Sequence, residues 1–205
     1  NNPVFTATIT DQFNKNSHLL ANAYAEVEII KGLTFKANFA YDFNSYNGYN
    51  FEEATPDQTR VNSLATLTRS HSEASSLLNE LFLTYNKPLG AHSLNVTAGY
   101  SGQSFKSESY YAQRKDYPDP SQDHRVLDNG SAANQYTGGS SGEAGLLSYF
   151  GRVNYGYQGK YLLTATIRAD GSSKFPPDKR WGYFPAFSAG WRISDETFFK
   201  NNINF

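Results

Sequence analysis

Strict alternation of apolar and polar residues is the feature of this sequence that most limits its fold. Across residues 33–43, the odd positions hold Leu, Phe, Ala or Tyr, and four of the five even positions are polar or charged. Successive side chains of a β-strand point to opposite faces, so a period of two predicts a strand whose faces meet unlike surroundings. Residues 19–29 alternate in the same way, and the intervening Lys31-Gly32 pair is typical of a tight hairpin.

The same hairpin unit recurs twice more, and a last strand follows, which predicts seven strands in all. The predicted strands cover residues 19–29, 33–43, 77–85, 93–105, 148–157, 161–170 and 183–193. Short connections at residues 31–32, 87–91 and 158–160 alternate with long ones at residues 44–70, 106–146 and 171–182. Because proline cannot donate a ladder hydrogen bond, Pro185 is expected near the start of the last strand.

Strand length and the asymmetry of the connections favour a transmembrane β-barrel. Eleven residues at roughly 3.3 Å each, tilted by about 40°, span roughly 27 Å, close to an apolar band of about 25 Å. Short turns at one end and long loops at the other are typical of such barrels, with the turns periplasmic and the loops extracellular. Tyr155, Tyr157 and Tyr161 lie where an aromatic girdle is expected.

A soluble β-sandwich is the alternative to the barrel, because its strands also alternate. The two folds differ in the use of the apolar face that includes Phe35, Ala37, Phe39, Ala165 and Ile167. In a barrel this face contacts lipid, whereas in a sandwich it forms a packed core. Seven strands are too few and odd in number for a closed bacterial barrel, so we expect the chain to be a fragment.

Composition excludes several other classes. The formal net charge is −1, which gives no basic surplus for a nucleic-acid partner. The absence of Cys excludes disulfides, thiolate metal sites and a Cys nucleophile. No run of 18 apolar residues is available for a membrane-spanning helix.

Two adjoining motifs, residues 148–175 (SYFGRVNYGYQGKYLLTATIRADGSSKF) and 180–194 (RWGYFPAFSAGWRIS), carry a family resemblance. Together with residues 26–33 and 77–99, they strongly resemble the SusC/RagA family of TonB-linked outer-membrane transporters. The resemblance covers most of residues 19–199 and is weak only in the long loops.

The resemblance implies an all-β fold, in which these strands are about seven of a 22-stranded, antiparallel up-and-down barrel. Residues 1–205 would be part of the barrel domain, with the plug and the TonB box absent from this chain. The implied partners are the rest of the same barrel and its plug, a SusD-like surface lipoprotein, the TonB complex and outer-membrane lipid. The implied function is proton-motive-force-driven import of oligosaccharides or peptides across the outer membrane of a Gram-negative bacterium. The alternative function is a soluble β-sheet carbohydrate-binding or adhesion module.

No catalytic constellation is found in the sequence, so no enzyme is predicted. Residues 138–142 (GGSSG) match G-x-S-x-G, but a nucleophile elbow needs a strand before the Ser and a helix after it. We interpret this Gly/Ser-rich stretch as a flexible loop. The four histidines lack metal-ligand spacing, and neither a metal nor a cofactor is expected.

The long segment 106–146 contains the residues most suited to ligand contact. Tyr110, Tyr111, Tyr117 and Asp116 are predicted to contact substrate or a covering lipoprotein, because a binding face needs apolar bodies with polar tips. An ordinary surface loop is the alternative. The carboxylates of this segment also allow a cation site, although their spacing matches no EF-hand loop. They are Asp116, Asp119, Asp123 and Asp128.

Four further polar or aromatic residues follow in the resemblance motifs. Arg168 and Asp170 lie two residues apart on the polar side of their strand, and Arg180 and Trp181 lie in the next loop. On a lumen-facing surface, Arg168 and Asp170 could pair with each other, with a neighbouring strand or with the plug. A structural role in barrel or loop packing is favoured for all four residues over ligand binding.

Overall fold

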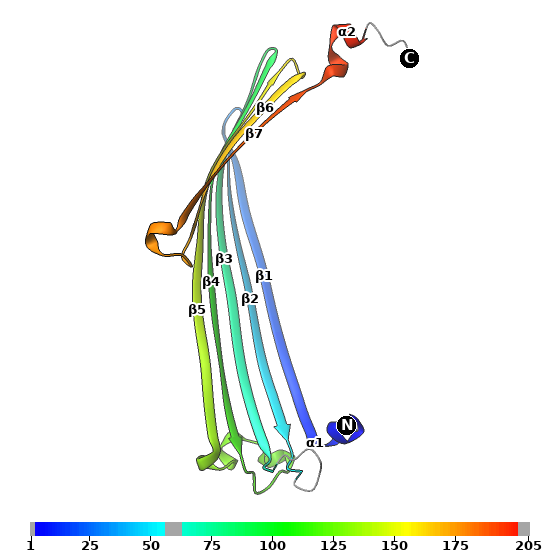
Figure 1. The fold of residues 1–205 in the computed structure, drawn as a ribbon, viewed down its shortest axis with the longest axis vertical. Coiled ribbons are helices and arrows are strands. Elements are labelled where there is room, and N and C mark those ends of the chain that lie inside the picture. Colours follow the sequence, from blue (N-terminus) through cyan, green and yellow to red (C-terminus); the bar gives the residue numbers. More distant parts are fainter. Residues whose placement is uncertain (1–2, 56–62, 201–205) are drawn as a thin grey trace. The chain divides into compact units, whose positions relative to one another are not determined.

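A computed structural model describes residues 3–55 and 63–200 of the chain. Its strands form a single seven-stranded sheet in which neighbours in the chain are neighbours in the sheet (Figure 1). The strands are β1 (Thr10–Ile30), β2 (Leu33–Glu52), β3 (Thr66–Leu89), β4 (His92–Lys115), β5 (Gln135–Tyr157), β6 (Tyr161–Ser172) and β7 (Trp181–Trp191). The short helices α1 (Pro3–Ile9) and α2 (Thr197–Lys200) flank the sheet in sequence. The predicted all-β, antiparallel up-and-down fold is confirmed.

The first five strands are about twice as long as predicted, at 20 to 24 residues each. The predicted loops 44–70 and 106–146 were wrong at their edges, because β2 and β4 continue into them and β3 and β5 begin within them. These extensions are mostly polar, and isolated apolar residues such as Phe51 and Leu67 give them no hydrophobic period. Backbone hydrogen bonds to neighbouring strands are nevertheless sufficient to extend the sheet. Residues 56–62 of the first predicted loop lie outside the described residues.

Pro185 lies inside β7 and not near a strand start, which corrects the predicted boundary. The strand begins at Trp181, and Pro185 is paired with Ile167 of β6. Because proline has no N–H group, it is tolerated where its nitrogen faces away from the paired strand. In the described sheet β7 has a neighbour on one side, which leaves room for this arrangement.

The three short connections contain glycines with left-handed backbone conformations, as tight hairpins require. Their φ angles are 84° for Gly32, 62° for Gly90 and 66° for Gly159. The predicted positions of the short turns are therefore confirmed.

The contacts of the chain divide it into two units. Unit 1 comprises Asn1–Leu20, Asp42–Ser75 and Phe105–Glu143, which include the long connections up to β5. Unit 2 comprises Ala21–Tyr41, Ser76–Ser104 and Ala144–Phe205, which include the short turns. None of the described helices combines the length and hydropathy needed to cross a membrane.

The buried hydrophobic residues of the described chain all lie in unit 1, and they are Phe51, Ala65, Leu67 and Tyr117. The apolar positions for which the sandwich required a packed core, Phe35, Ala37, Phe39, Ala165 and Ile167, are not buried. Phe39 is 51% exposed and Ile167 is 58% exposed. The described residues therefore form neither the second sheet nor the core of the sandwich alternative.

Candidate functional site

A row of hydrogen-bonded polar side chains crosses four strands of unit 2. Asn22 of β1 donates from Nδ2 to Asn38 Oδ1 of β2 over 3.0 Å, and Asn38 Nδ2 donates to Glu80 Oε2 of β3 over 3.1 Å. Ser101 of β4 donates to the other carboxylate oxygen, Glu80 Oε1, over 3.5 Å. This first polar row places a carboxylate among neutral donors on one face of the sheet.

A second polar row runs through β3, β4, β5 and β6. Thr164 Oγ1 donates to Asn154 Oδ1, and Asn154 Nδ2 donates to Asn95 Oδ1, each over 2.9 Å. Asn95 in turn donates to Asn86 Oδ1. Neither row was predicted from the sequence. The sequence does place asparagines at the polar positions of several alternating strands. It does not give the strand register that joins these asparagines into rows.

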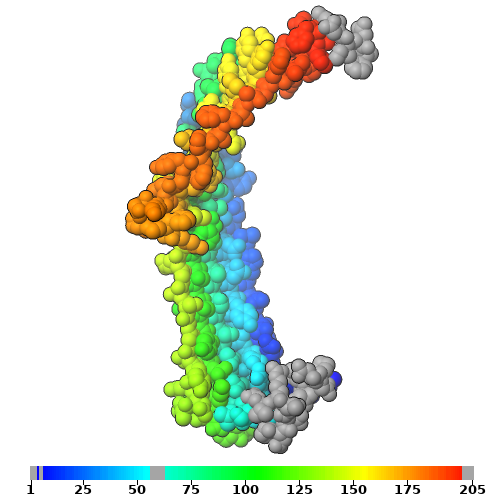
Figure 2. Space-filling view, in the orientation of Figure 1, coloured from blue at the N-terminus to red at the C-terminus, as the bar shows by residue number. Residues whose placement is uncertain are grey.

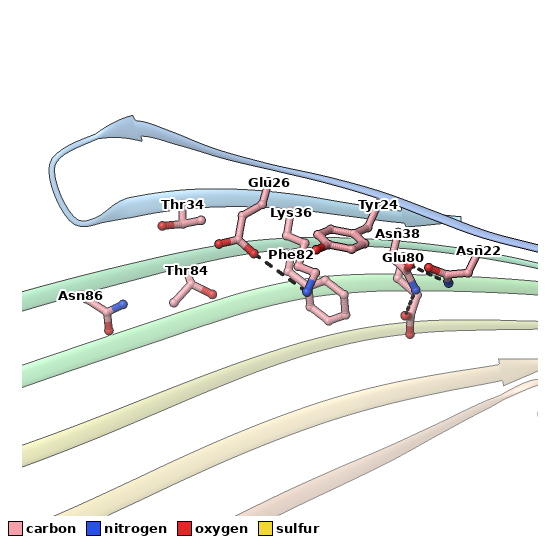
Figure 3. Close-up of a pocket in the computed structure, with 10 residues that line it drawn as sticks. All are labelled: Asn22, Tyr24, Glu26, Thr34, Lys36, Asn38, Glu80, Phe82, Thr84 and Asn86. Atoms are coloured by element: carbon pink, nitrogen blue, oxygen red, sulfur yellow. Dashed lines mark hydrogen bonds and ion pairs between the residues drawn. The ribbon is translucent and has the colours of Figure 1, made fainter. Parts of the chain in front are cut away.

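An open hollow of about 680 Å³ lies on the polar face of β1, β2 and β3 (Figure 3). Lys36 lies 3.9 Å from Glu26 and 5.1 Å from the centroid of the Tyr24 ring. Phe82 contributes an aromatic surface, and its ring centroid is 5.7 Å from that of Phe150. The hollow is therefore polar with an aromatic patch, and its ten lining residues come from three adjacent strands.

Arg168 and Asp170 pair with each other in β6. Arg168 Nε lies 2.7 Å from Asp170 Oδ1, and Arg168 Nη2 donates to Ser148 Oγ of β5 over 3.2 Å. Arg180 donates from Nε to the Phe175 carbonyl, which holds its own loop together. Trp181 is the first residue of β7 and lies over Gly171 of β6.

The opposite face of unit 2 is apolar and exposed. Ala165 of β6 is paired with Phe187 of β7, and Phe187 is 81% exposed. Further exposed apolar residues on alternate positions include Val27, Ile29, Leu81, Leu83, Val153 and Leu163. An apolar surface that crosses every strand of a sheet normally meets another protein surface or a membrane.

Aromatic rings line the end of unit 2 that carries the short turns. The ring centroids of Tyr157 and Tyr161 are 6.2 Å apart, and those of Tyr161 and Trp191 are 6.3 Å apart in stacked geometry. Tyr161 Oη and Trp191 Nε1 both donate to Glu196 Oε1, over 2.7 and 3.1 Å, and Lys160 Nζ lies 3.1 Å from Glu196 Oε2. These bonds lower the pKa of the Glu196 carboxyl, the one from Tyr161 most strongly.

In unit 1 the segment 116–134 packs against the ends of β2 and β3, as the green and cyan surfaces of Figure 2 show. Arg125 lies 3.1 Å from carboxylate oxygens of both Asp11 and Glu53, with its guanidinium carbon 4.3 Å from the centroid of the Phe51 ring. Tyr117 packs edge-on against Phe51 at 5.5 Å. This connection is therefore a folded cap that shares a small core with the ends of β2 and β3.

The structure does not bring the four predicted contact residues together on one exposed surface. Tyr110 and Tyr111 are consecutive in β4 and point to opposite faces. Asp116 is exposed, and its backbone N–H donates to the Ala65 carbonyl. Tyr117 is only 7% exposed, its hydroxyl has no hydrogen-bond partner among the described residues, and burial raises its pKa. A contact role stays a prediction for the first three, and the buried position of Tyr117 does not favour one.

The G-x-S-x-G stretch lies within β5, so its interpretation as a flexible loop was wrong. Ser140 Oγ is 3.0 Å from Ser109 Oγ of β4, and the strand continues beyond it without the helix of a nucleophile elbow. Among the carboxylates of the same segment, Asp119 lies 3.2 Å from His124, and Asp128 lies 3.5 Å from Arg114. Within residues 3–55 and 63–200, no three His, Asp or Glu side chains form a group suited to a metal ion.

Comparison with known proteins gives related sequences although no family model matches. The chain is 34% identical to TonB-dependent receptor P3 of Formosa agariphila, over 98% of this chain and 20% of that protein. It is also 34% identical to TonB-dependent receptor SusC of Bacteroides thetaiotaomicron, over 62% of this chain and 12% of that protein. The chain thus spans about a fifth or less of these curated relatives, which are receptors and not enzymes.

A solved structure of the RagAB peptide transporter shares the fold. Its TM-score is 0.88 at 20% sequence identity, over 96% of this chain and 22% of the matched chain. The RagAB peptide importer in its closed-closed state gives the same TM-score over 98% of this chain. At this identity the likeness establishes the fold, and the matched region is 22% of the RagAB chain.

Proposed function

As this chain is homologous to a barrel section of the SusC/RagA family of TonB-linked outer-membrane transporters, we propose that it forms part of the wall of an outer-membrane nutrient importer. The carrying observation is the contrast between the two faces of unit 2. One face has hydrogen-bonded polar rows, and the other exposes apolar side chains on every strand. In a transmembrane barrel the polar face lines the lumen and the apolar face contacts lipid.

Contact with lipid would cover the apolar surface that unit 2 otherwise exposes to water. Apolar side chains in water cost roughly 25 cal/mol for each Å² that stays exposed, and Phe187, Ile167 and Leu163 are all more than half exposed. Acyl chains around these residues would cover that surface without a second protein layer. The aromatic row at the short turns would then lie at the membrane–water interface, where Tyr and Trp rings are favoured.

The domain and partners of the whole importer follow from this assignment. We propose that the 205 residues belong to the barrel domain, with the plug and the TonB-contacting segment elsewhere in the longer polypeptide. A SusD-like lipoprotein would cover the extracellular end, and TonB would drive uptake of oligosaccharides or peptides. The names of the relatives support this proposal, and co-purification of a lipoprotein with the tagged receptor, together with loss of uptake in cells without TonB, would test it.

Two lysine substitutions on one strand test the assignment of faces. Ala37 lies on the apolar side of β2 and Ala40 on the polar side, and both are half-buried. In the full-length protein, Ala37→Lys is expected to lower the free energy of unfolding in lipid vesicles by about 2–4 kcal/mol. The matched Ala40→Lys variant is expected to change it by less than about 1 kcal/mol, because its charge enters a polar lumen.

Fluorophores attached to Cys at the same two positions supply an independent readout. A quencher dissolved in the lipid phase should quench the label at position 37 and leave the label at position 40 bright. Equal quenching at both positions, or equal destabilisation by both lysines, would contradict the barrel. The soluble-module alternative expects no lipid quenching at either position.

A further inference from the structure

A second hollow, in unit 1, has a different chemistry from the one in Figure 3. It occupies about 350 Å³ between β2, β3, β4 and β5. We call it the serine–tyrosine hollow, and its defining side chains are Tyr46, Ser70, Ser72, Ser109, Tyr111 and Ser140. Hydrogen bonding joins this face across β4, because Gln113 donates to Thr68 on one side and Ser109 meets Ser140 on the other.

Glycines beneath the two tyrosines make room for their rings. A Cβ atom on Gly138 would stand 2.6 Å from the Tyr111 ring, and one on Gly48 would stand 3.1 Å from the Tyr46 ring. Each ring therefore occupies the space above a glycine of the adjacent strand or of its own. Tyr111 is 43% exposed, so a substantial part of its surface is open to a ligand.

Hydroxyl groups lie between the rings. Ser70, Ser72 and the Tyr111 hydroxyl have no hydrogen-bond partner within residues 3–55 and 63–200. Ser109 and Ser140 contact each other through their Oγ atoms at 3.0 Å, and Tyr46 donates to Asn14 over 2.8 Å. The hollow thus offers several donors and acceptors beside aromatic surface.

The defining side chains carry no formal charge at neutral pH. His71 and Tyr110 also border the hollow, and their rings lie against each other with centroids 5.0 Å apart. The ring nitrogens of His71 lie 2.8 Å from Asn47 Oδ1 and 3.2 Å from Glu73 Oε1. A ligand with an ionised group would therefore meet no opposite formal charge among these defining side chains. A neutral ligand with one apolar surface and a rim of hydroxyls is complementary to them.

We propose that the serine–tyrosine hollow binds a neutral carbohydrate ring, stacked on Tyr111 or Tyr46 and hydrogen-bonded to Ser70 and Ser72. The inference rests on the proposed function, because it assigns the importer a substrate class and a lumen-facing contact. The proposed site therefore groups Tyr111 with Tyr46 and the serines of β3, and not with the predicted contact residues Asp116 and Tyr117.

Binding to the full-length receptor, measured by titration calorimetry, tests the proposal. The probes are maltohexaose, cellohexaose and mannohexaose, and the hexapeptide Gly-Ser-Ala-Gly-Ser-Ala serves as the competing class. The variants are Tyr111→Ala and Gly138→Ala. Tyr110→Ala is the matched control, because Tyr110 borders the hollow while its ring lies against His71 on the other face of β4. Gly138→Ala keeps every ligand-binding group and only displaces the Tyr111 ring, so it separates geometry from loss of contact.

At least one hexasaccharide should bind the wild type, and both test variants should weaken it at least tenfold, whereas Tyr110→Ala should change it less than twofold. The inference is overturned if none of the three saccharides binds, if Tyr110→Ala weakens binding equally, or if the peptide binds more tightly and is lost in the same variants. Membrane insertion of each variant is measured in parallel by heat-modifiable gel mobility. Failed insertion of the wild type would refute the proposed function, whereas intact insertion without saccharide binding would refute only this inference.

Discussion

The strands of unit 1 end on a small packed core, whereas those of unit 2 leave a whole apolar face exposed. In unit 1, Phe51 and Leu67 are 0% and 1% exposed, and Arg125 covers the Phe51 ring while pairing with two carboxylates. In unit 2, Phe39 is 51% exposed although its strand is the same β2 that carries Phe51. Two phenylalanines of one strand therefore have opposite environments.

This difference is the one expected if unit 1 folds in water and unit 2 lies in lipid, as proposed. A packed core with charged residues around it is the usual solution to folding in water. A sheet without a core, with polar side chains bonded to each other on one face, is suited to lipid on the other face. The polar rows are expected to contribute more to stability in unit 2 than in unit 1, because unit 2 has no packed core and its side chains contact one another in cross-strand pairs.

The largest expected effect compares the two phenylalanines. Phe51→Ala should destabilise unit 1 by about 3–5 kcal/mol, because it removes a fully buried ring with its contacts to Tyr117 and Arg125. Phe39→Ala in the lipid-embedded protein should cost less than about half as much, because lipid fills the vacated space. Hydrogen-exchange mass spectrometry of segment 116–134 measures the first effect, and equal losses in both variants would erase the contrast between the units.

The buried Tyr117 and the exposed Tyr111 offer a second comparison, in which one variant is expected to stabilise unit 1. Tyr117→Phe removes a buried hydroxyl that has no partner in the described part of the chain, and should raise the stability of the cap by about 1 kcal/mol. Tyr111→Phe, which removes an exposed hydroxyl from the neighbouring strand, should change stability by less than about 0.5 kcal/mol. A loss of protection in Tyr117→Phe would mean that the hydroxyl has a partner in the full-length protein.

Removal of one side-chain amide from each face of unit 2 compares the polarity of the two faces. Asn95→Ala breaks the second polar row at its middle and should cost about 1 kcal/mol in vesicles. Asn79 lies on the apolar side of β3, so Asn79→Ala should be neutral or stabilising in lipid. Denaturant titration of both variants gives the comparison, and a greater loss for Asn79→Ala would reverse the assignment of faces.

The smallest effect is the pH dependence of the turn at Glu196. Its carboxyl pKa is lowered by hydrogen bonds from Tyr161, Trp191 and Lys160. A lowered pKa means that the bonds stabilise the fold fully above the ordinary value of about 4.5 and are lost as the pH falls through the folded value. Exchange protection of residues 193–199, corrected for intrinsic rates, should therefore fall below about pH 4.5 in the wild type. Glu196→Gln should show no such pH step, and a step that persists would assign the effect to another group.

The sequence predicted the two-faced strands well and the candidate sites only in part. Alternation located the strands of unit 2 and their short turns, because each residue there reports its own environment. Tyr111 was identified as a contact candidate, but its proposed partners Tyr46 and Ser70 are 65 and 41 positions away in the chain. Tyr117 was expected on a binding surface, and a tyrosine in a Pro- and Asp-rich segment gives no local sign that its ring is buried.

By itself the sequence determined the all-β fold, the order and faces of the strands, the tight turns and the family resemblance, because each depends on local period or on residues close together in the chain. Only the tertiary structure decided how far the strands extend, since polar extensions have no period and are held by neighbouring backbones. It also decided the polar rows, the Arg125 contacts to Asp11 and Glu53, and the serine–tyrosine hollow. The polar rows and the hollow depend on strand register, and the Arg125 contacts depend on the packing of segment 116–134, which brings residues more than a hundred positions apart within hydrogen-bonding distance.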